Sequence, residues 1–364
     1  MENLSCLSQT NIPTEPSVSI IICTYNRAQS LRATLDGLAK ARIPQGWAGE
    51  VIVVDNGSTD ETEEVVKTAV LSSSVRYLKE PKRGLDNARN TGLAHARGDI
   101  ILFTDDDVQV AKDWVERMVD SLISGKCDAV TGRITIPPCS MKPWMTYMHA
   151  LGVSTAPRRI ARPWNFRVRF RSPRRVVSSL HENGTVELRG ANMGFWRHVL
   201  SSVAGFDPEL DVGALGLCGE TLFSQQLGEA GFAIAYAPDA HVVHHFDLRR
   251  LRRESLLEGY RKYGRSLAYV RYHWEHKNIK VPWLLYCLLW IKLHLRRALN
   301  PRPPPGAEGC PPWELSYIQQ LEMLRQFRVE RNRPRNYTKR GLKKLEHSKL
   351  VPRYSDSPTG RGRS

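Results

Sequence analysis

Apolar residues gather in short runs along the first part of the chain, with amphipathic stretches between them. Val18–Tyr25 and Glu50–Asp55 are nearly continuous β-branched runs, as in strands that are buried on both faces. Between them, Ser30–Ala41 places leucines at helical spacing. Asp60–Val70 opens with acids and continues apolar, which also favours a helix. The pattern predicts a βαβα start.

The same alternation continues to about residue 136. It is typical of a mainly parallel sheet covered by helices, which is an α/β fold resembling the Rossmann type. Further strands are predicted at Val75–Leu78, Asp99–Thr104 and Ala129–Ile136, and further helices at Leu85–Ala96 and Trp114–Ile123.

Composition is that of a folded protein, with 25% charged and 41% apolar residues among 364. The seven cysteines form no Cys-x-x-Cys pair, which argues for a reducing compartment and against a zinc site. The first 14 residues carry no apolar signal segment. We therefore expect a cytoplasmic protein.

The net charge of +16 is distributed very unevenly. Residues 247–364 hold 27 Lys and Arg against 10 Asp and Glu, whereas residues 1–246 hold 26 against 27. A nearly neutral half followed by a basic half suggests that the C-terminal part meets an anionic surface, either phospholipid or nucleic acid.

Three consecutive acids, Asp105, Asp106 and Asp107, follow the apolar run that ends at Thr104. Carboxylates so close together repel one another unless a strong positive charge lies between them, and hard divalent cations prefer oxygen ligands. Ligand sites in open α/β sheets lie at the carboxyl ends of the strands. The triplet thus indicates a Mg²⁺ or Mn²⁺ site, although solvated acids or a helix cap are the alternative.

The other predicted strands also end in polar residues. The first ends at Thr24 and Tyr25, with no Gly-x-Gly-x-x-Gly turn behind it, and no Walker-type loop occurs elsewhere. Asp55 closes the second strand, where it could accept hydrogen bonds from a nucleobase. Asp60, beyond the Asn-Gly turn, is expected to be a helix N-cap.

Four ordered motifs give the chain a resemblance to a known family. These are residues 18–27 (VSIIICTYNR), 53–60 (VVDNGSTD), 83–90 (RGLDNARN) and 103–107 (FTDDD). Together they resemble the nucleotide-sugar half of family 2 glycosyltransferases, and the resemblance covers roughly residues 18–246.

The resemblance implies the A-type glycosyltransferase fold, GT-A, and an inverting transfer from a nucleoside diphosphate sugar to a saccharide or lipid-linked acceptor. It also implies a divalent metal, Mg²⁺ or Mn²⁺, at an Asp-x-Asp motif. Metal ligands would be Asp105, Asp107 and, on a later strand, His244. The donor would be bound by Thr24, Tyr25, Asn26, Arg27, Asp55, Arg83, Asn87, Arg89, Asp105 and Asp106.

An inverting transfer needs one carboxylate as general base. The family usually carries adjacent Glu and Asp at the start of a helix, whereas this chain has Gly219 and Glu220. One acid remains, so Glu220 is the expected base, with favourable placement at a helix N-terminus as the alternative. By the same resemblance, Asn192, Gly194 and Asp211 would contact the acceptor.

Four segments are predicted: a flexible N-terminus (1–15), a GT-A domain (16–246), a basic helical extension (247–330) and a disordered basic tail (331–364). The domain divides into a nucleotide-sugar half (16–138) and an acceptor half (139–246). The arginine-rich segment 158–175 is expected to be a loop or β-ribbon.

Within the extension, the uncharged run Val281–Ile291 is too short to cross a bilayer. It fits either an interfacial helix on an anionic membrane or a helix packed on the core. Polysaccharide or cell-envelope glycan synthesis is typical of the family. Two rival functions remain, a nucleotidyltransferase acting on sugar phosphates and a nucleic-acid-binding protein, although no known nucleic-acid-binding motif is found.

Overall fold

The structure is a computed structural model, and it describes residues 16–345 except 126, 141, 143–185, 212, 213, 281, 301–303 and 305. Its centre is an eight-stranded sheet in the order β3-β2-β1-β4-β7-β6-β8-β5. Four strands form a parallel half: β1 (Ser17–Thr24), β2 (Ala48–Asp55), β3 (Ser74–Lys79) and β4 (Ile100–Asp105).

The other half of the sheet is mixed. The strand β7 lies antiparallel between β4 and β6, β8 is parallel to β6, and β5 pairs antiparallel with the end of β8. These strands are β5 (Val108–Val110), β6 (Ala129–Thr135), β7 (Met193–Trp196) and β8 (Ile234–His244).

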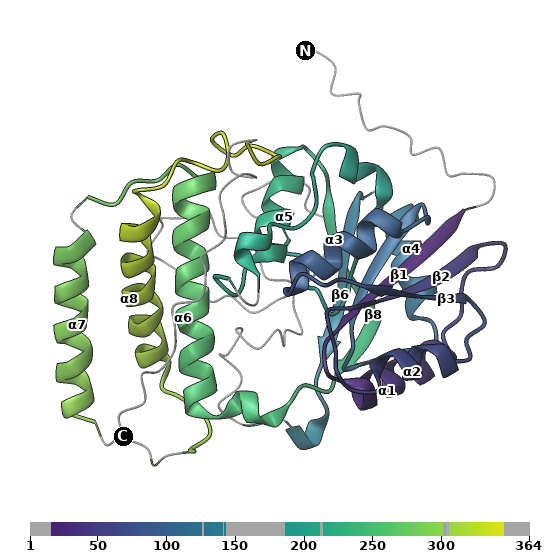
Figure 1. Cartoon of the computed structure of the whole chain (residues 1–364), viewed down its shortest axis with the longest axis horizontal. Helices are drawn as coiled ribbons and strands as arrows, with labels where there is room; N and C mark the ends of the chain where they lie inside the picture. Colours follow the sequence, from purple (N-terminus) through teal and green to yellow (C-terminus); the bar gives the residue numbers. More distant parts are fainter. Residues whose placement is uncertain are drawn as a thin grey trace.

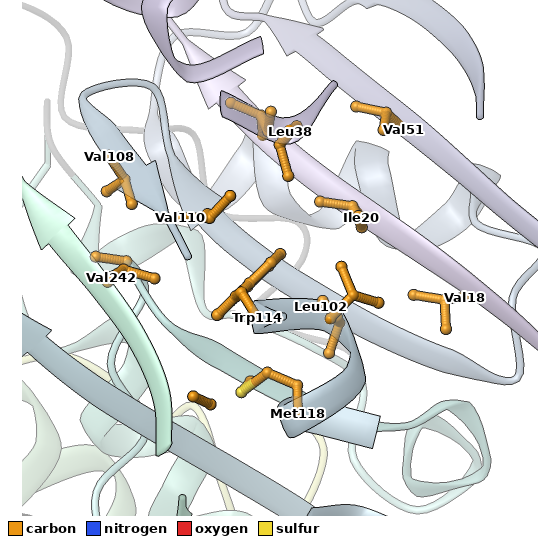
Figure 2. Close-up of a cluster of buried hydrophobic side chains, with 14 of the residues drawn as sticks. Val18, Ile20, Leu38, Val51, Leu102, Val108, Val110, Trp114, Met118 and Val242 are labelled. Carbon is orange, nitrogen blue, oxygen red and sulfur yellow. The ribbon is translucent and has the colours of Figure 1, made fainter. Parts of the chain in front are cut away.

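Side chains alternate between the two faces of the sheet, and each face has its own core. On one face Val18, Ile20 and Ile22 pack against α1 (Ala28–Leu38), α2 (Thr62–Thr68) and α4 (Trp114–Ser124). Figure 2 shows Trp114 in the middle of this cluster, among side chains from several strands. Because both faces are covered, the strands read as continuous apolar runs rather than alternating ones.

The opposite face is covered by α3 (Leu85–His95) and α5 (Gly219–Glu229). Ile21, Ile101 and Phe103 point to this side, where Phe223 from α5 packs among them and other aromatic rings. The start of α5 is therefore fixed near the carboxyl ends of the central strands.

Three long helices follow the sheet, α6 (Arg253–Tyr269), α7 (Pro282–Ala298) and α8 (Pro312–Glu330). Figure 1 shows them side by side, with α8 between α6 and α7 and with α7 outermost. Ile136 and Phe246, which follow β6 and β8, join the apolar cluster of these helices. The extension is thus packed on the α/β domain.

Most predicted elements agree with the structure to within two residues at their ends, but two strands were missed and part of the tail was assigned wrongly. The missed strands, β5 and β7, are only three and four residues long. Disorder from residue 331 is wrong as far as residue 345, because Asn336 and Tyr337 are buried. Residues 158–175 lie outside the described part.

Candidate active site

A pocket of about 620 Å³ opens at the carboxyl ends of the central strands, between the sheet and helices α6 and α8. Polar and charged side chains from the ends of β1, β4 and β8 meet there with others from α3 and α5. Ten of the residues predicted from the sequence line it: Thr24, Tyr25, Arg27, Arg83, Arg89, Asp105, Asp106, Asp107, Glu220 and His244.

Asp105, Asp107 and His244 form a cluster whose potential ligand atoms all lie within 4.8 Å of one another. The antiparallel pairing of β5 with β8 places Val108 opposite His244, which brings the imidazole beside the acids. The backbone N–H of His245 also donates to the carbonyl of Asp107 at 2.8 Å. Strand pairing therefore sets the relative positions of the three side chains.

The contact between His244 and Asp107 suits a shared cation. The distance from Nε2 to Oδ1 is 2.9 Å, yet this buried oxygen makes no hydrogen bond of normal geometry. An imidazole nitrogen and carboxylate oxygens are a donor set that Mn²⁺ accepts readily and that Mg²⁺ accepts less well. These three residues therefore fit a divalent metal.

Arg27 and Thr24 hold the neighbouring acids in place. One guanidinium nitrogen of Arg27 donates to Asp106 at 3.0 Å and to Asp107 at 2.8 Å, and the Thr24 hydroxyl donates to Asp106 at 2.8 Å. Burial raises the pKa of Asp106 to about 6, although Arg27 opposes that shift. Both carboxylate oxygens of Asp106 thus accept hydrogen bonds from other side chains of the protein, and these bonds orient the loop that carries Asp107.

Tyr25 and Arg83 form another wall of the pocket. The Arg83 guanidinium lies 3.1 Å from the centre of the Tyr25 ring, and it donates to the carbonyl of Asn56 at 2.8 Å. The Tyr25 side chain remains 42% exposed, so an aromatic surface is available to a bound group.

Glu220 stands in the first turn of α5, and its carboxylate accepts a hydrogen bond from Arg89 at 2.7 Å. The same guanidinium donates to Asp86 at 2.9 Å, so a buried cation lies between two acids. Burial raises the pKa of Glu220, but Arg89 and the backbone amide lower it more, so that the pKa lies below its ordinary value. Glu220 is therefore ionised at neutral pH and is 28% exposed to the pocket.

Two glycines make room for this arrangement. A Cβ on Gly190 would lie 2.2 Å from the Arg89 guanidinium and 2.7 Å from the Glu220 carboxylate. A Cβ on Gly219 would lie 2.2 Å from the Asp86 carboxylate. The side chain of Asp86 thus fills the space beside the residue where the related family usually has its first acid.

Comparison with known proteins agrees with this geometry. Residues 19–182 match the model of the family described as "Glycosyl transferase family 2". The chain contains a family 2 glycosyl transferase region. Two curated relatives are glycosyltransferase AglE of Haloferax volcanii (32% identical over 123 residues) and succinoglycan biosynthesis protein ExoM of Rhizobium meliloti (30% over 119 residues). The matches cover 33% and 32% of this chain but only 40% and 38% of those relatives.

A solved structure shows the fold beyond the family 2 region. It is that of mannosyltransferase PcManGT from Pyrobaculum calidifontis, in complex with GDP-Man and Mn²⁺. The likeness covers 87% of both chains, with a TM-score of 0.52 and 19% sequence identity. The fold of this chain is GT-A, as the sequence predicted.

Two residues expected to contact an acceptor lie in the interior instead. Asn192 is fully buried, where it donates to the carbonyls of Arg133 and Ala240 and accepts from the indole of Trp114. Gly194 belongs to β7, and a Cβ there would lie 2.4 Å from the Leu102 side chain. Both positions serve packing of the sheet, and neither lines the pocket.

The third expected acceptor residue, Asp211, is also buried. Its carboxylate accepts from the backbone N–H groups of Asp86 and Asn87, at 2.9 and 3.2 Å. It therefore caps α3 from a distant part of the chain, because Gly84, the residue before the helix, has no side chain to do so.

Three expected donor residues do not line the pocket. Asp55 accepts from the N–H of Ser58 and from the hydroxyl of Tyr77, Asn26 accepts from the N–H of Thr59, and Asn87 donates to the carbonyl of Arg83. In the structure these side chains form hydrogen bonds with residues 58, 59, 77 and 83. Their expected contact with the donor is not supported.

Sequence reasoning missed several residues that do line the pocket. Arg250 was assigned to a basic surface, yet it belongs to the pocket wall with Arg189. The only available signal for Arg189 was its place three residues before Asn192, an expected acceptor residue, and Arg250 gave none. The extension contributes Tyr260 and Tyr263 from α6 and Gln319 from α8.

Proposed function

We propose that this chain is a metal-dependent, inverting glycosyltransferase that moves a sugar from a nucleoside diphosphate donor to a hydroxyl group of a saccharide or lipid-linked acceptor. One observation carries the proposal. The candidate metal ligands Asp105, Asp107 and His244 and the ionised Glu220 line one pocket at the edge of the sheet.

Glu220 is the proposed general base. It takes the proton of the acceptor hydroxyl while the oxygen attacks the anomeric carbon, and the bond from that carbon to the diphosphate breaks on the opposite side. A cation held by Asp105, Asp107 and His244 would supply positive charge for the diphosphate that leaves. Arg89 is a positioning residue, because its guanidinium donates a hydrogen bond that fixes the Glu220 carboxylate.

The donor is proposed to lie along the wall formed by Tyr25, Arg83 and Arg27, with Arg250 facing the diphosphate. Tyr25 offers a partly exposed ring for a nucleobase, and guanidinium groups are suited to phosphate oxygens. The similarity to succinoglycan biosynthesis protein ExoM favours a role in polysaccharide or envelope glycan synthesis.

The decisive experiment measures the product that leaves. With a panel of nucleotide sugars and glycan acceptors, we expect release of a nucleoside diphosphate that requires Mn²⁺ or Mg²⁺ and stops with chelator. Release of pyrophosphate from a nucleoside triphosphate would instead identify a nucleotidyltransferase. Salt-sensitive nucleic-acid binding without any turnover would identify the nucleic-acid binder.

The role of Glu220 is tested with Glu220→Gln and a matched control on the same helix. Transfer should fall by about 10² to 10⁴, the usual contribution of a general base, while donor binding followed by thermal shift is retained. The control is Glu229→Gln, because Glu229 is exposed at the end of α5, in an ion pair with Arg340. It should keep full activity, and near-normal turnover of Glu220→Gln would remove Glu220 from the base role.

A further inference from the structure

The outermost helix of the extension, α7, packs on the protein with only one narrow stripe. Tyr286, Leu289 and Leu293 recur at helical spacing and join the cluster formed with α6 and α8. The guanidinium of Arg297 extends the same stripe by pairing with the buried carboxylate of Glu314. This contact anchors the helix and fixes which side of it faces away.

The side of α7 opposite this stripe is apolar and exposed. At 100° per residue, Leu284, Leu288, Ile291 and Leu295 point away from the packed stripe. Their exposed fractions are 43, 48, 49 and 61%. Four large aliphatic side chains in one row on the outside of a folded chain mark an interaction surface.

The two sides of the helix between this row and the packed stripe carry different groups. Trp283 and Trp290 lie on one side and are 56% and 47% exposed. Lys292 and Arg296 lie along the other side and both are exposed, although the Arg296 guanidinium also lies 4.7 Å from the centre of the Trp313 ring of α8. There is no Asp or Glu between 282 and 298. Indole rings prefer the headgroup level of a bilayer, and long cationic side chains reach toward lipid phosphates while their stems remain in the apolar layer.

We propose that α7 lies flat on an anionic membrane, with Leu284, Leu288, Ile291 and Leu295 inserted and with Lys292 and Arg296 in contact with lipid phosphates. A helix of 17 residues is about 25 Å long and fits the plane of the interface. Among the described residues no helix is long and apolar enough to cross the bilayer.

Charge favours a membrane over a second copy of the chain on this face. Residues 247–364 carry 27 basic against 10 acidic residues, so pairing two copies through α7 would bring two strongly basic regions together. An anionic lipid surface instead attracts this charge. The proposal extends beyond catalysis, because membrane binding does not depend on which reaction the pocket performs.

The test is flotation of the full chain with vesicles of phosphatidylcholine and phosphatidylglycerol at a ratio of about 3 to 1, compared with phosphatidylcholine alone. We expect the chain to float with the anionic vesicles and to release partly when salt rises from about 0.1 M to about 1 M. Brominated lipid should quench the tryptophan fluorescence, since Trp283 and Trp290 would lie at the interface.

Two variants separate the apolar and the electrostatic parts. Leu288→Glu with Ile291→Glu should lower partitioning by about tenfold or more, because both inserted side chains become charged. Lys292→Glu with Arg296→Glu should abolish the preference for anionic vesicles. Val70→Glu is the matched control, since Val70 is an 87% exposed apolar residue outside the extension, and it should float like the parent.

Folding of each variant is checked by its thermal midpoint. It should hardly change for the Leu288 and Ile291 variant and for Val70→Glu, whose substituted side chains are exposed. The Lys292 and Arg296 variant should lose a little stability, because Arg296 no longer stacks on Trp313. The proposal is overturned if the parent chain does not float, or if the Leu288 and Ile291 variant floats as well as the parent. It is also overturned if the parent forms a stable dimer in solution, this variant is monomeric, and neither chain floats with the vesicles. Turnover in solution is measured separately, so failure of catalysis and failure of membrane binding are distinguishable.

Discussion

At the scale of single residues, the departure from the family pattern at Gly219 has a physical explanation. Asp86 is 2% exposed and is held by Arg89, and its carboxylate occupies the space that a side chain at position 219 would need. Burial raises the pKa of Asp86 well above its ordinary value, while Arg89 opposes the shift. A second acid at 219 would therefore meet a carboxyl group that cannot move into solvent.

This explanation predicts the outcome of restoring an acid there. Gly219→Asp should lower the free energy of unfolding by about 1 to 3 kcal/mol, through overpacking against the buried Asp86 carboxyl group. The double variant Gly219→Asp with Asp86→Ala should lose less stability than the sum of the two single losses, because Asp86→Ala vacates the space that the new side chain needs. Urea unfolding of the four chains measures this coupling.

The control for this cycle is Gly259→Asp in α6, where a Cβ would meet nothing within 4 Å. That change should be nearly neutral, or slightly favourable because glycine is a poor helix former. Strict additivity of Gly219→Asp and Asp86→Ala would contradict the proposed competition for space.

The residue scale also shows what could be predicted from the sequence. Asp107 and Glu220 line the pocket as expected from the sequence, because the motif and the strand or helix end that carries each are local. The partner of Glu220, Arg89, lies 131 residues away, so its ion pair follows only from the folded chain. Asn192 was expected to contact an acceptor for the same reason. Its burial and its hydrogen bond from the Trp114 indole depend on a helix that is distant in the sequence.

At the scale of elements, long or strongly patterned segments were predicted well and short ones were not. The parallel strands are continuous apolar runs, whereas β7 has four residues and β5 has three, too few to show a period. Residues 331–345 have few large apolar groups, so composition indicated disorder. In the structure they are attached by polar contacts to one buried carboxylate, Asp207.

Asp207 explains why that segment is ordered. Its carboxylate accepts from the hydroxyls of Tyr269 and Tyr337, each at 2.7 Å, and it pairs with Lys344 at 2.5 Å. One acid from the α/β domain thereby holds the last turn of α6 and the chain that follows α8. Composition alone does not reveal such a contact.

We predict that Tyr337→Phe lowers the free energy of unfolding by about 1.5 to 3 kcal/mol, the usual range for a hydrogen bond to a charged group. Tyr286→Phe is the control, because no hydrogen bond of the Tyr286 hydroxyl is found among the described residues, and it should cost less than about 0.5 kcal/mol. Urea unfolding midpoints compare the two. Equal midpoints for both variants would show that Asp207 does not order this segment.

At the scale of the whole molecule, the extension is joined to itself and to the domain by buried polar pairs as well as by apolar packing. His273, which follows α6, and Glu330, at the end of α8, are both fully buried and lie 2.9 Å apart. The backbone N–H of Asn336 donates to Nδ1 of His273 at 3.1 Å. Nδ1 is thus an acceptor, which requires the neutral ring with its proton on Nε2 directed at Glu330.

A neutral, buried His273 gives stability a definite dependence on pH. Burial lowers the pKa of His273 below its ordinary value, although Glu330 opposes the shift. As pH falls below about 6.5, the His273 side chain therefore becomes protonated in the unfolded chain before it does so in the folded chain. The contribution of His273 to the free energy of unfolding is full above that pH and is lost below it. The pKa of Glu330 is also lowered, despite the opposing effect of burial. Its contribution is therefore lost only at more acidic pH, below about 4.3.

The raised pKa of His244 gives stability the opposite dependence on pH. The contribution of His273 is therefore isolated by comparing the parent with His273→Gln at each pH, because the effect of His244 is the same in both chains. The difference in free energy of unfolding between the two chains should be larger at pH 7.5 than at pH 5.5. It can change by at most about 1.4 kcal/mol per pH unit, the limit for one proton. A difference that stays constant between these pH values would mean that His273 is not held neutral, and one that grows toward acid would mean that the pair is ionic.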